Sequence, residues 1–265
     1  MKIAILAFTA RGSLCARFLQ QNLGGHVYLP ERLVRDGEGT LPITGSLPEF
    51  VEKLFGTCEG IVFVSATGIA VRAIAPHVKS KWEDPAVVVV DEGRRFVVSL
   101  LSGHWGGGND LTAKVARILG ATPVITTASD LESIKTPEMV AKEHGFWVEH
   151  REDLPRLSAL LLEGKTLVYV TDDEAIRQEL AQDVMWVRAI PPQAQGVIFI
   201  TDKTVEVPEL PFLILRPRRL VLGIGMRRSI SSGHLRTLVN DFLTAQGVAR
   251  RGVGKIASVE RKRHE

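Results

Sequence analysis

The chain has 265 residues, 45% of them hydrophobic and 24% charged, which is the composition of an ordinary globular protein and excludes a largely disordered chain. This length allows one large or two modest domains. A net charge of +3 is a mild excess that favours a small anionic ligand, without the clustered basic stripe of a nucleic-acid groove. The basic runs at 216–219 and 260–265 are typical of a linker and a solvated tail, so we expect no nucleic-acid partner.

The N-terminal stretch MKIAILAFTARG has an apolar segment too short for a signal peptide and predicts a first β-strand instead. No run in the sequence approaches the roughly 18 apolar residues of a membrane-spanning helix, so we expect a soluble protein with no membrane partner. Cys15 and Cys58 have no metal-ligand spacing, and we expect them to be reduced thiols of a cytoplasmic protein.

Short apolar runs alternate with segments of helical period through the first half of the chain. Because the runs are nearly continuous in Val, Ile and Leu, they predict an α/β fold with a mostly parallel sheet and helices on both faces. The expected strands are KIAILAF (2–8), GIVFV (60–64), AVVVV (86–90), FVVSLL (96–101) and TPVITT (122–127), and the expected helices lie at 13–22, 68–76, 110–119 and 137–143.

The second half has a weaker pattern. Thr136 before Pro137 predicts a helix N-cap, and Gly145 predicts the end of that helix. The expected elements that follow are helices at 152–162 and 173–181 and strands at 166–170, 184–187, 196–200 and 212–215.

These patterns predict three domains: an N-terminal α/β domain at 1–145, a smaller α/β domain at 146–215 and, after a linker at 216–219, the start of a third α/β unit at 220–265. The third unit is expected to be an incomplete C-terminal domain, because a lone β-α-β fragment cannot bury both faces of its strands.

The first candidate ligand loop follows the strand at 60–64. Ser65, Thr67 and Gly68 open the next helix, and Arg72 lies about one turn further along. Hydroxyls and unpaired N–H groups at a helix N-terminus suit a carboxylate or phosphate, with which an arginine can pair. An ordinary helix cap with a surface arginine explains the same residues.

The second candidate is SGHWGGGND at 102–110, after the strand at 96–101. Asn109 and Asp110 stand where a Walker A loop needs Lys and Ser or Thr, and Trp105 interrupts the dinucleotide fingerprint. The later GIG is only weak evidence for a nucleotide site. His104 could serve as a general acid or base, whereas a histidine that hydrogen-bonds the loop is the alternative. Asp110 is expected to be the N-cap of the following helix.

The order of elements from Gly60 to Asp130 resembles the CbiG family of cobalamin-biosynthesis proteins, the cobalt-precorrin-5A hydrolases. MKIAILAFTARG fits the family's N-terminal strand, and the segment after Asp130 resembles its middle region. LVLGIGMRRSIS resembles the start of its C-terminal domain, most of which we expect to lie outside this sequence.

The resemblance implies an enzyme that opens the ring A δ-lactone of cobalt-precorrin-5A and releases acetaldehyde to give cobalt-precorrin-5B. The implied substrate is a tetrapyrrole that carries many carboxylates and its own cobalt, so we expect no cofactor and no metal-ligand cluster in the protein. We predict that His104 activates the attacking water and that N–H groups around Gly106 to Gly108 hold the oxyanion. The predicted substrate-binding residues are Ser65, Thr67, Gly68, Arg72, Ser102, Gly103, Gly106, Gly107, Gly108, Asn109 and Asp110.

The incomplete third unit leaves an alternative open. The chain would then be a non-catalytic tetrapyrrole-binding or partner subunit of the same pathway. Under either function, the further partners that we expect are other enzymes of cobalamin biosynthesis or a separately encoded C-terminal domain.

Overall fold

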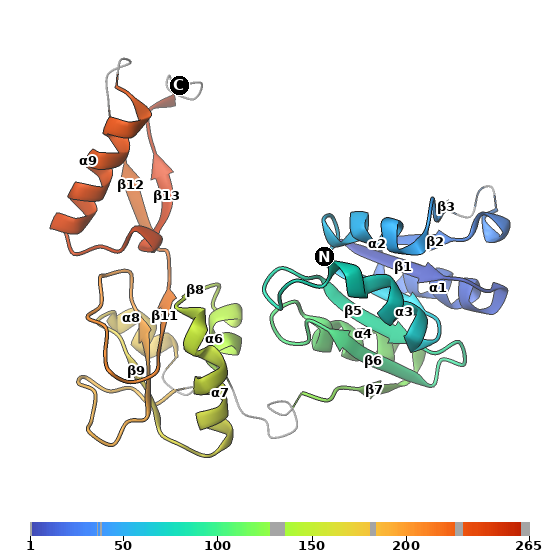
Figure 1. Ribbon diagram of the computed structural model, residues 1–265, viewed down its shortest axis with the longest axis horizontal. Helices are drawn as coiled ribbons and strands as arrows, with labels where there is room; N and C mark the ends of the chain where they lie inside the picture. Colours follow the sequence, from blue (N-terminus) through green and yellow to red (C-terminus); the bar gives the residue numbers. More distant parts are fainter. Residues whose placement is uncertain are drawn as a thin grey trace. The chain divides into compact units, whose positions relative to one another are not determined.

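The computed structural model describes residues 2–35, 37, 39–127, 136–180, 184–225 and 230–260. The chain forms two compact units, Met1–Glu132 and Ser133–Glu265, each with its own sheet (Figure 1). The predicted α/β fold is confirmed. The domain boundaries predicted at 145, 215 and 219 stay predictions.

Unit 1 is built on a seven-stranded sheet with the strand order β3-β2-β1-β4-β5-β6-β7. Its strands are β1 (Ile3–Ala7), β2 (His26–Leu29), β3 (Thr40–Pro42), β4 (Gly60–Val64), β5 (Ala86–Val90), β6 (Phe96–Leu101) and β7 (Thr122–Val124). Neighbours pair in parallel except β5 and β6, in which Val90 lies opposite Val97 and Val87 opposite Leu101. Since β7 is parallel to β6, these two strands run against the rest of the sheet.

Helices cover both faces of this sheet, as predicted (Figure 1). One face packs against α1 (Ala10–Leu23) and α4 (Gly108–Leu119), and the other against α2 (Leu47–Phe55) and α3 (Thr67–Ile74). Alternate side chains of the buried β5 point to opposite layers, because successive residues of a strand face opposite sides of the sheet. The elements β2, β3 and α2 were not among the predicted ones.

Unit 2 contains a four-stranded sheet with the order β8-β11-β10-β9. Its strands are β8 (Trp147–Glu149), β9 (Leu167–Val170), β10 (Gly196–Ile200) and β11 (Phe212–Arg216), and its helices are α6 (Pro137–Glu143), α7 (Leu154–Leu162) and α8 (Glu174–Glu179). The last three strands are parallel, and β8 is antiparallel to β11. The predicted N-cap is confirmed, since the Thr136 side chain accepts a hydrogen bond from Met139 N–H. The strand predicted at 184–187 is wrong: Trp186 makes only an isolated bridge to Tyr169.

The rest of unit 2 is a parallel two-stranded sheet, β12 (Leu220–Gly223) and β13 (Val253–Ala257), joined along the chain by α9 (Ser232–Ala245). It matches the strand–helix–strand pattern predicted for the third unit. Asp202 connects this part to the four-stranded sheet, because its carboxylate accepts hydrogen bonds from the backbone N–H groups of Arg218 and Arg219. Short 3₁₀ helices complete the fold at Glu31–Leu33, Ala75–His77, Arg151–Asp153 and Arg250–Gly252.

Candidate functional site

The predicted site residues fall into two groups at opposite edges of the seven-stranded sheet. Ser65 lies at the carboxyl ends of β4 and β5, where its N–H donates to Val90 O at 3.0 Å. Ser102 directly follows Leu101, which pairs with Val87 near the start of β5. A five-residue strand at about 3.3 Å per residue places these edges roughly 16 Å apart. The structure therefore does not bring the two groups together.

The first group, Ser65 to Arg72, forms what we term the carboxyl-edge group. Ala66 is the N-cap residue of α3 and makes no side-chain capping hydrogen bond. Ile69 N–H donates to Ala66 O at 3.0 Å, so the N–H groups that this turn offers to a ligand are those of Thr67 and Gly68. Thr67 and Gly68 are exposed in that turn. The guanidinium of Arg72 donates to Gly68 O at 3.1 Å and so lies along the same turn. The Ser65 hydroxyl donates to Ala66 O at 3.2 Å, so the groups of this turn that suit a carboxylate are the Thr67 hydroxyl, the helix N-terminus and Arg72.

A cavity of 290 Å³ adjoins the carboxyl-edge group. Its hydroxyl-bearing lining residues follow β4, and its larger apolar lining residues come from β5, β6 and β7. The lining residues are Ser65, Ala66, Thr67, Val89, Asp91, Phe96, Val98 and Val124. The Phe96 side chain is 44% exposed and offers a flat apolar surface at this edge.

Asp91, which the sequence reasoning did not select, closes the turn between β5 and β6. Burial by itself would raise the pKa of its carboxyl group. The hydrogen bonds that it accepts from the backbone N–H groups of Phe96, Arg95 and Gly93 outweigh this effect and hold the pKa below its ordinary value. The carboxylate is therefore engaged in holding the turn, and it gives the cavity one fixed negative charge.

The second group, Ser102 to Asp110, is the glycine loop. Its N–H groups are largely used inside the loop: Gly107 N–H donates to His104 O at 3.2 Å and Gly108 N–H to Ser102 O at 2.9 Å. Asn109 N–H donates to Gly103 O at 2.9 Å. Two of the three glycine N–H groups that we predicted as oxyanion donors are thus already paired.

Packing within the loop accounts for its glycines. A Cβ added to Gly106 would lie 2.5 Å from Ser102 Cβ, and one added to Gly108 would lie 2.7 Å from Leu101 O. Gly107 has a φ of +81°, which side chains rarely adopt. Ser102 itself has a φ of +56°, and its buried hydroxyl has no hydrogen-bond partner among the described residues. The loop is strained at this position.

Asp110 is not the helix N-cap that we predicted. Gly107 occupies the N-cap position, α4 begins at Gly108, and Asp110 lies in the first turn, where its charge still favours the helix dipole. The prediction failed because the tight glycine loop starts the helix earlier than the side-chain pattern indicates.

The remaining loop residues differ in surroundings. His104 is half-buried, and the next residue, Trp105, packs edge-to-face on Trp82 with ring centroids 4.8 Å apart. Asn109 is buried: Ser99 Oγ donates to its Oδ1 at 2.7 Å, and its Nδ2 donates to Thr127 Oγ1 at 3.1 Å. Neither the aromatic contact nor the two hydrogen bonds was predicted from the sequence, because contacts between separate segments leave no local pattern.

Within the described ranges, no group of three or more His, Cys, Asp or Glu residues is arranged to hold a metal ion. In the same part of the chain, no helix combines the length and the apolar character needed to cross a membrane. Cys15 is buried and Cys58 half-buried, and both are free thiols. Burial raises the pKa of the Cys15 thiol, against the opposing influence of Arg94.

Residues 49–130 match the family described as Cobalamin synthesis G N-terminal, and residues 136–217 match the Cobalamin biosynthesis central region. A cobalt-precorrin-5A hydrolase of Salmonella typhimurium is 34% identical over 271 residues, which cover 99% of this chain and 76% of that relative. A cobalt-precorrin-5A hydrolase of Priestia megaterium is 29% identical, with 99% of this chain and 75% of the relative covered. The crystal structure of a cobalamin biosynthesis protein G homolog from Sulfolobus solfataricus has a TM-score of 0.50 and 22% identity, covering 98% of this chain and 75% of that one.

Proposed function

This chain belongs to the cobalt-precorrin-5A hydrolase family of cobalamin biosynthesis, and we propose that it opens the ring A δ-lactone of cobalt-precorrin-5A and releases acetaldehyde, giving cobalt-precorrin-5B. The main support for this function is the 34% sequence identity to the Salmonella typhimurium hydrolase across 99% of the chain. The enzyme class expected from the resemblance is thereby confirmed. In our proposal the cobalt is part of the substrate, and the protein supplies no cofactor.

The carboxyl-edge group is proposed to bind an acidic side arm of the tetrapyrrole. The uncapped first turn of α3 supports this role, because its N–H groups and the Thr67 hydroxyl can donate to a carboxylate while Arg72 neutralises it. The apolar side of the adjoining cavity, which includes Phe96 and Val98, suits the edge of a macrocycle. A volume of 290 Å³ is too small for the whole ring system, and the Asp91 carboxylate in its lining would repel an acidic group, so the acidic arm is proposed to lie at the first turn of α3.

The glycine loop is proposed to carry the reaction itself. Lactone opening needs a base that activates water and donors that stabilise the oxyanion, and a base must then assist loss of the aldehyde. His104 is the proposed base. Gly106 keeps its proposed donor role, whereas the N–H groups of Gly107 and Gly108 are paired within the loop. The other predicted binding residues of this edge, Ser102, Gly103, Asn109 and Asp110, would orient the loop and the substrate.

The carboxyl-edge group and the glycine loop lie at opposite edges of the sheet, so their proposed roles can be tested separately. A lactone ring that reaches His104 lies at the glycine-loop edge, so an arm bound beside Ser65 has to belong to a part of the same substrate roughly 16 Å away. An experiment can therefore refute the proposed role of one group and leave the proposed role of the other unchanged.

Acetaldehyde trapping tests the function. The purified chain is incubated with cobalt-precorrin-5A without added metal or cofactor, and acetaldehyde and cobalt-precorrin-5B are quantified. Removing a general base costs about 100-fold or more in rate, so His104→Ala should lose at least that much, while His26→Ala, at an exposed histidine elsewhere in unit 1, should retain the rate. Equal rates for His104→Ala and wild type would remove His104 as the base. Substrate binding by the wild-type chain without turnover would favour the non-catalytic subunit instead.

A further inference from the structure

Three arginine side chains of unit 2 converge on one indole ring. The guanidinium carbons of Arg151, Arg218 and Arg251 lie 5.4, 5.6 and 5.2 Å from the ring centroid of Trp147. Trp147 begins β8, and Arg151 lies in the 3₁₀ helix that follows this strand. Arg218 and Arg251 come from the segments that lead into β12 and β13. Folding therefore gathers positive charges from separate segments into what we term the arginine cluster.

Two members of the arginine cluster have no acidic partner. Among the described residues, the side chains of Arg218 and Arg251 form neither an ion pair nor a hydrogen bond, and both residues are exposed. Because all three guanidinium carbons lie within 5.6 Å of one point, no two are farther apart than about 11 Å, close to the screening length of about 8 Å at physiological salt. These like charges repel one another, and a bound anion would relieve the repulsion.

The backbone holds the two exposed arginines in place. The Asp202 carboxylate accepts hydrogen bonds from the N–H groups of Arg218 and Arg219, at 3.0 and 3.2 Å. The Asp202 carbonyl oxygen accepts another from Ala249 N–H at 2.9 Å, so one residue fixes the segments that carry Arg218 and Arg251. Arg218 has a φ of +56°, which is strained for a residue other than glycine. Strain of this kind persists only where the surrounding structure imposes it, and it is concentrated at ligand sites.

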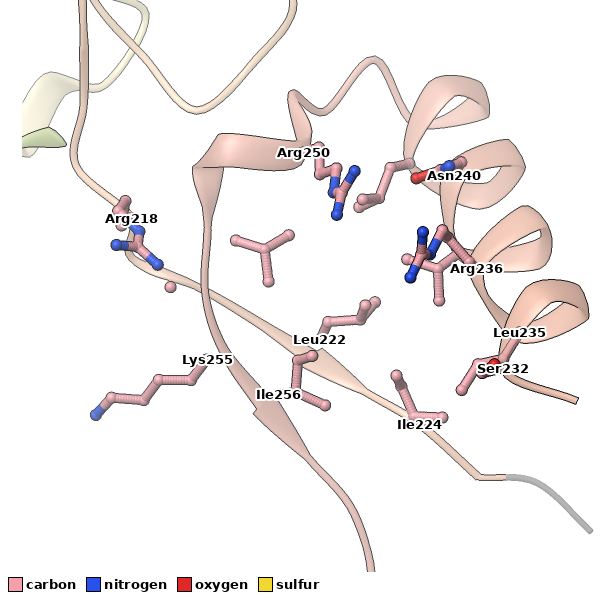
Figure 2. A pocket seen from close by; sticks show the side chains of 14 residues that line it. Arg218, Leu222, Ile224, Ser232, Leu235, Arg236, Asn240, Arg250, Lys255 and Ile256 are labelled. Atoms are coloured by element: carbon pink, nitrogen blue, oxygen red, sulfur yellow. The ribbon is translucent and has the colours of Figure 1, made fainter. Parts of the chain in front are cut away.

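Two glycines bring these segments into close contact. A Cβ added to Gly252 would lie 2.6 Å from Asp202 O, and one added to Gly254 would clash with Arg218 O. The start of β13 approaches the other segment this closely because both residues lack a side chain. Figure 2 shows Arg218 on the segment that leads into β12, and Arg250, the neighbour of Arg251, on the turn that leads into β13. The cluster is therefore positioned by backbone packing before any ligand binds.

The chemistry of the arginine cluster favours a compact ligand with more than one negative charge. A guanidinium group presents a planar pair of donors that matches a carboxylate. Several such groups around one ring suit carboxylates on neighbouring positions of one small molecule. Single-stranded nucleic acid fits less well, because its bases stack on open aromatic faces, whereas Trp147 is half-buried and already contacts three guanidinium groups.

We propose that the arginine cluster is a further binding site of this chain, for adjacent acidic arms of a tetrapyrrole. Arg218 and Arg251 each pair with one carboxylate, and Arg151 adds positive charge beside them, with Trp147 as the common surface on which the guanidinium groups rest. The identity of the ligand rests on the proposed function, since the implied substrate carries many carboxylates. The site itself belongs to unit 2, whereas the carboxyl-edge group and the glycine loop belong to unit 1.

Calorimetric titration with uroporphyrin tests the proposal. This tetrapyrrole has an acetate and a propionate arm on every pyrrole ring and contains no lactone, so binding is measured without turnover. Arg218→Ala and Arg251→Ala should each weaken binding about tenfold, because each removes one charge-assisted contact. Arg156→Ala, at an exposed arginine of α7, should bind as the wild type does. Added salt should weaken wild-type binding and reduce the difference between wild type and the two variants.

Thermal unfolding separates ligand binding from a purely structural contact. Uroporphyrin should raise the unfolding temperature of the wild type but not that of the double variant Arg218→Ala/Arg251→Ala. No binding by the wild type, or equal affinity of the wild type and both single variants, would overturn the proposal. If the variants lost stability at unchanged affinity, the arginines would serve only to hold β12 and β13 against β8. A dT oligonucleotide that binds more tightly than uroporphyrin and depends on the same arginines would also overturn it, in favour of nucleic acid.

The arginine cluster and the proposed function can fail separately. A chain that binds uroporphyrin through Arg218 and Arg251 but releases no acetaldehyde from cobalt-precorrin-5A would contradict the proposed function alone. A chain that releases acetaldehyde, with the same KM and the same uroporphyrin affinity in the wild type and both variants, would contradict the arginine cluster alone.

Discussion

Ser65 and Ser102 each follow a strand of the same sheet directly, yet they lie at opposite edges of it, and these edges are separated by the length of a five-residue strand, roughly 16 Å. The cause is the reversal between β5 and β6. Loops after strands converge only where the strands run in the same direction, so the carboxyl-edge group and the glycine loop are separate places on unit 1.

Arg72→Ala tests carboxylate binding at the carboxyl edge. We expect the KM for cobalt-precorrin-5A to rise about tenfold with kcat unchanged, because a charge-assisted contact made equally in the ground and transition states affects binding alone. Arg156→Ala, at an exposed arginine of α7, is the matched control and should leave both constants at the wild-type values. A fall in kcat without a change in KM would contradict the binding role.

Gly106→Ala tests the packing of the glycine loop. The new methyl group would lie 2.5 Å from Ser102 Cβ, so the variant should lose about 1–3 kcal/mol in its free energy of unfolding. Gly56→Ala serves as the control, since that residue has ordinary helical dihedral angles and its added Cβ meets nothing closer than 3.9 Å. Urea unfolding measures both variants, and equal stabilities would show that the loop yields to the extra carbon.

The stability contributed by Asp91 should depend on pH. Its folded-state pKa is lowered, so its stabilising effect is complete above the unfolded-state pKa, ordinarily about 3.9, and is lost as the pH falls through the lower folded-state value. The difference in unfolding free energy between wild type and Asp91→Asn should therefore be largest near neutral pH and shrink in acid. Glu206→Gln, at an exposed position, supplies the comparison. A difference for Asp91→Asn that is constant with pH would refute the assignment.

Arg216 and Glu149 form an ion pair within the four-stranded sheet, with 2.6 Å between Nε and Oε2 and the arginine side chain only 4% exposed. Arg216 also donates to the carbonyl oxygens of Thr201 and Lys203. Glu149→Ala should lower the free energy of unfolding by about 3 kcal/mol, since it leaves a buried charge without its partner.

Two comparisons check this ion-pair prediction. Glu174→Ala removes a surface pair with Arg177 and should cost under about 1 kcal/mol. The double variant Glu149→Leu/Arg216→Met should be more stable than Glu149→Ala, because no charge remains buried. If thermal or urea unfolding shows the same loss for all three variants, the burial of Arg216 is not the cause.

The buried strands of unit 1 were predictable because each is a short Val- and Ile-rich run, as in GIVFV and AVVVV. The change of strand direction at β6 could also have been predicted from the local sequence. Only residues 91–95 separate β5 from β6, and a parallel crossover needs a dozen or more. Asp91 and Gly93 supply the turn chemistry for a hairpin there.

Other features had no local signal. The hydrogen bonds of Asn109 to Ser99 and Thr127 join segments whose pairing depends on the sheet order. VMWV at 184–187 has the composition of a strand, but in the fold it contributes only the single bridge of Trp186. The composition of a segment shows whether it is suited to a strand, but the segment becomes a strand only where neighbouring strands are available to pair with it.

The β5–β6 reversal also bears on how this enzyme can change over time. Substitutions at sites farther apart than about 10 Å that share no partner have nearly additive energetic effects. The two edges of the unit 1 sheet meet that condition within the folded chain, so a substitution at Ser65 or Arg72 needs no compensating change at Ser102 or His104 to keep unit 1 stable. For the stability of unit 1, the two edges can therefore accumulate substitutions independently, because the buried strands between them hold both in place.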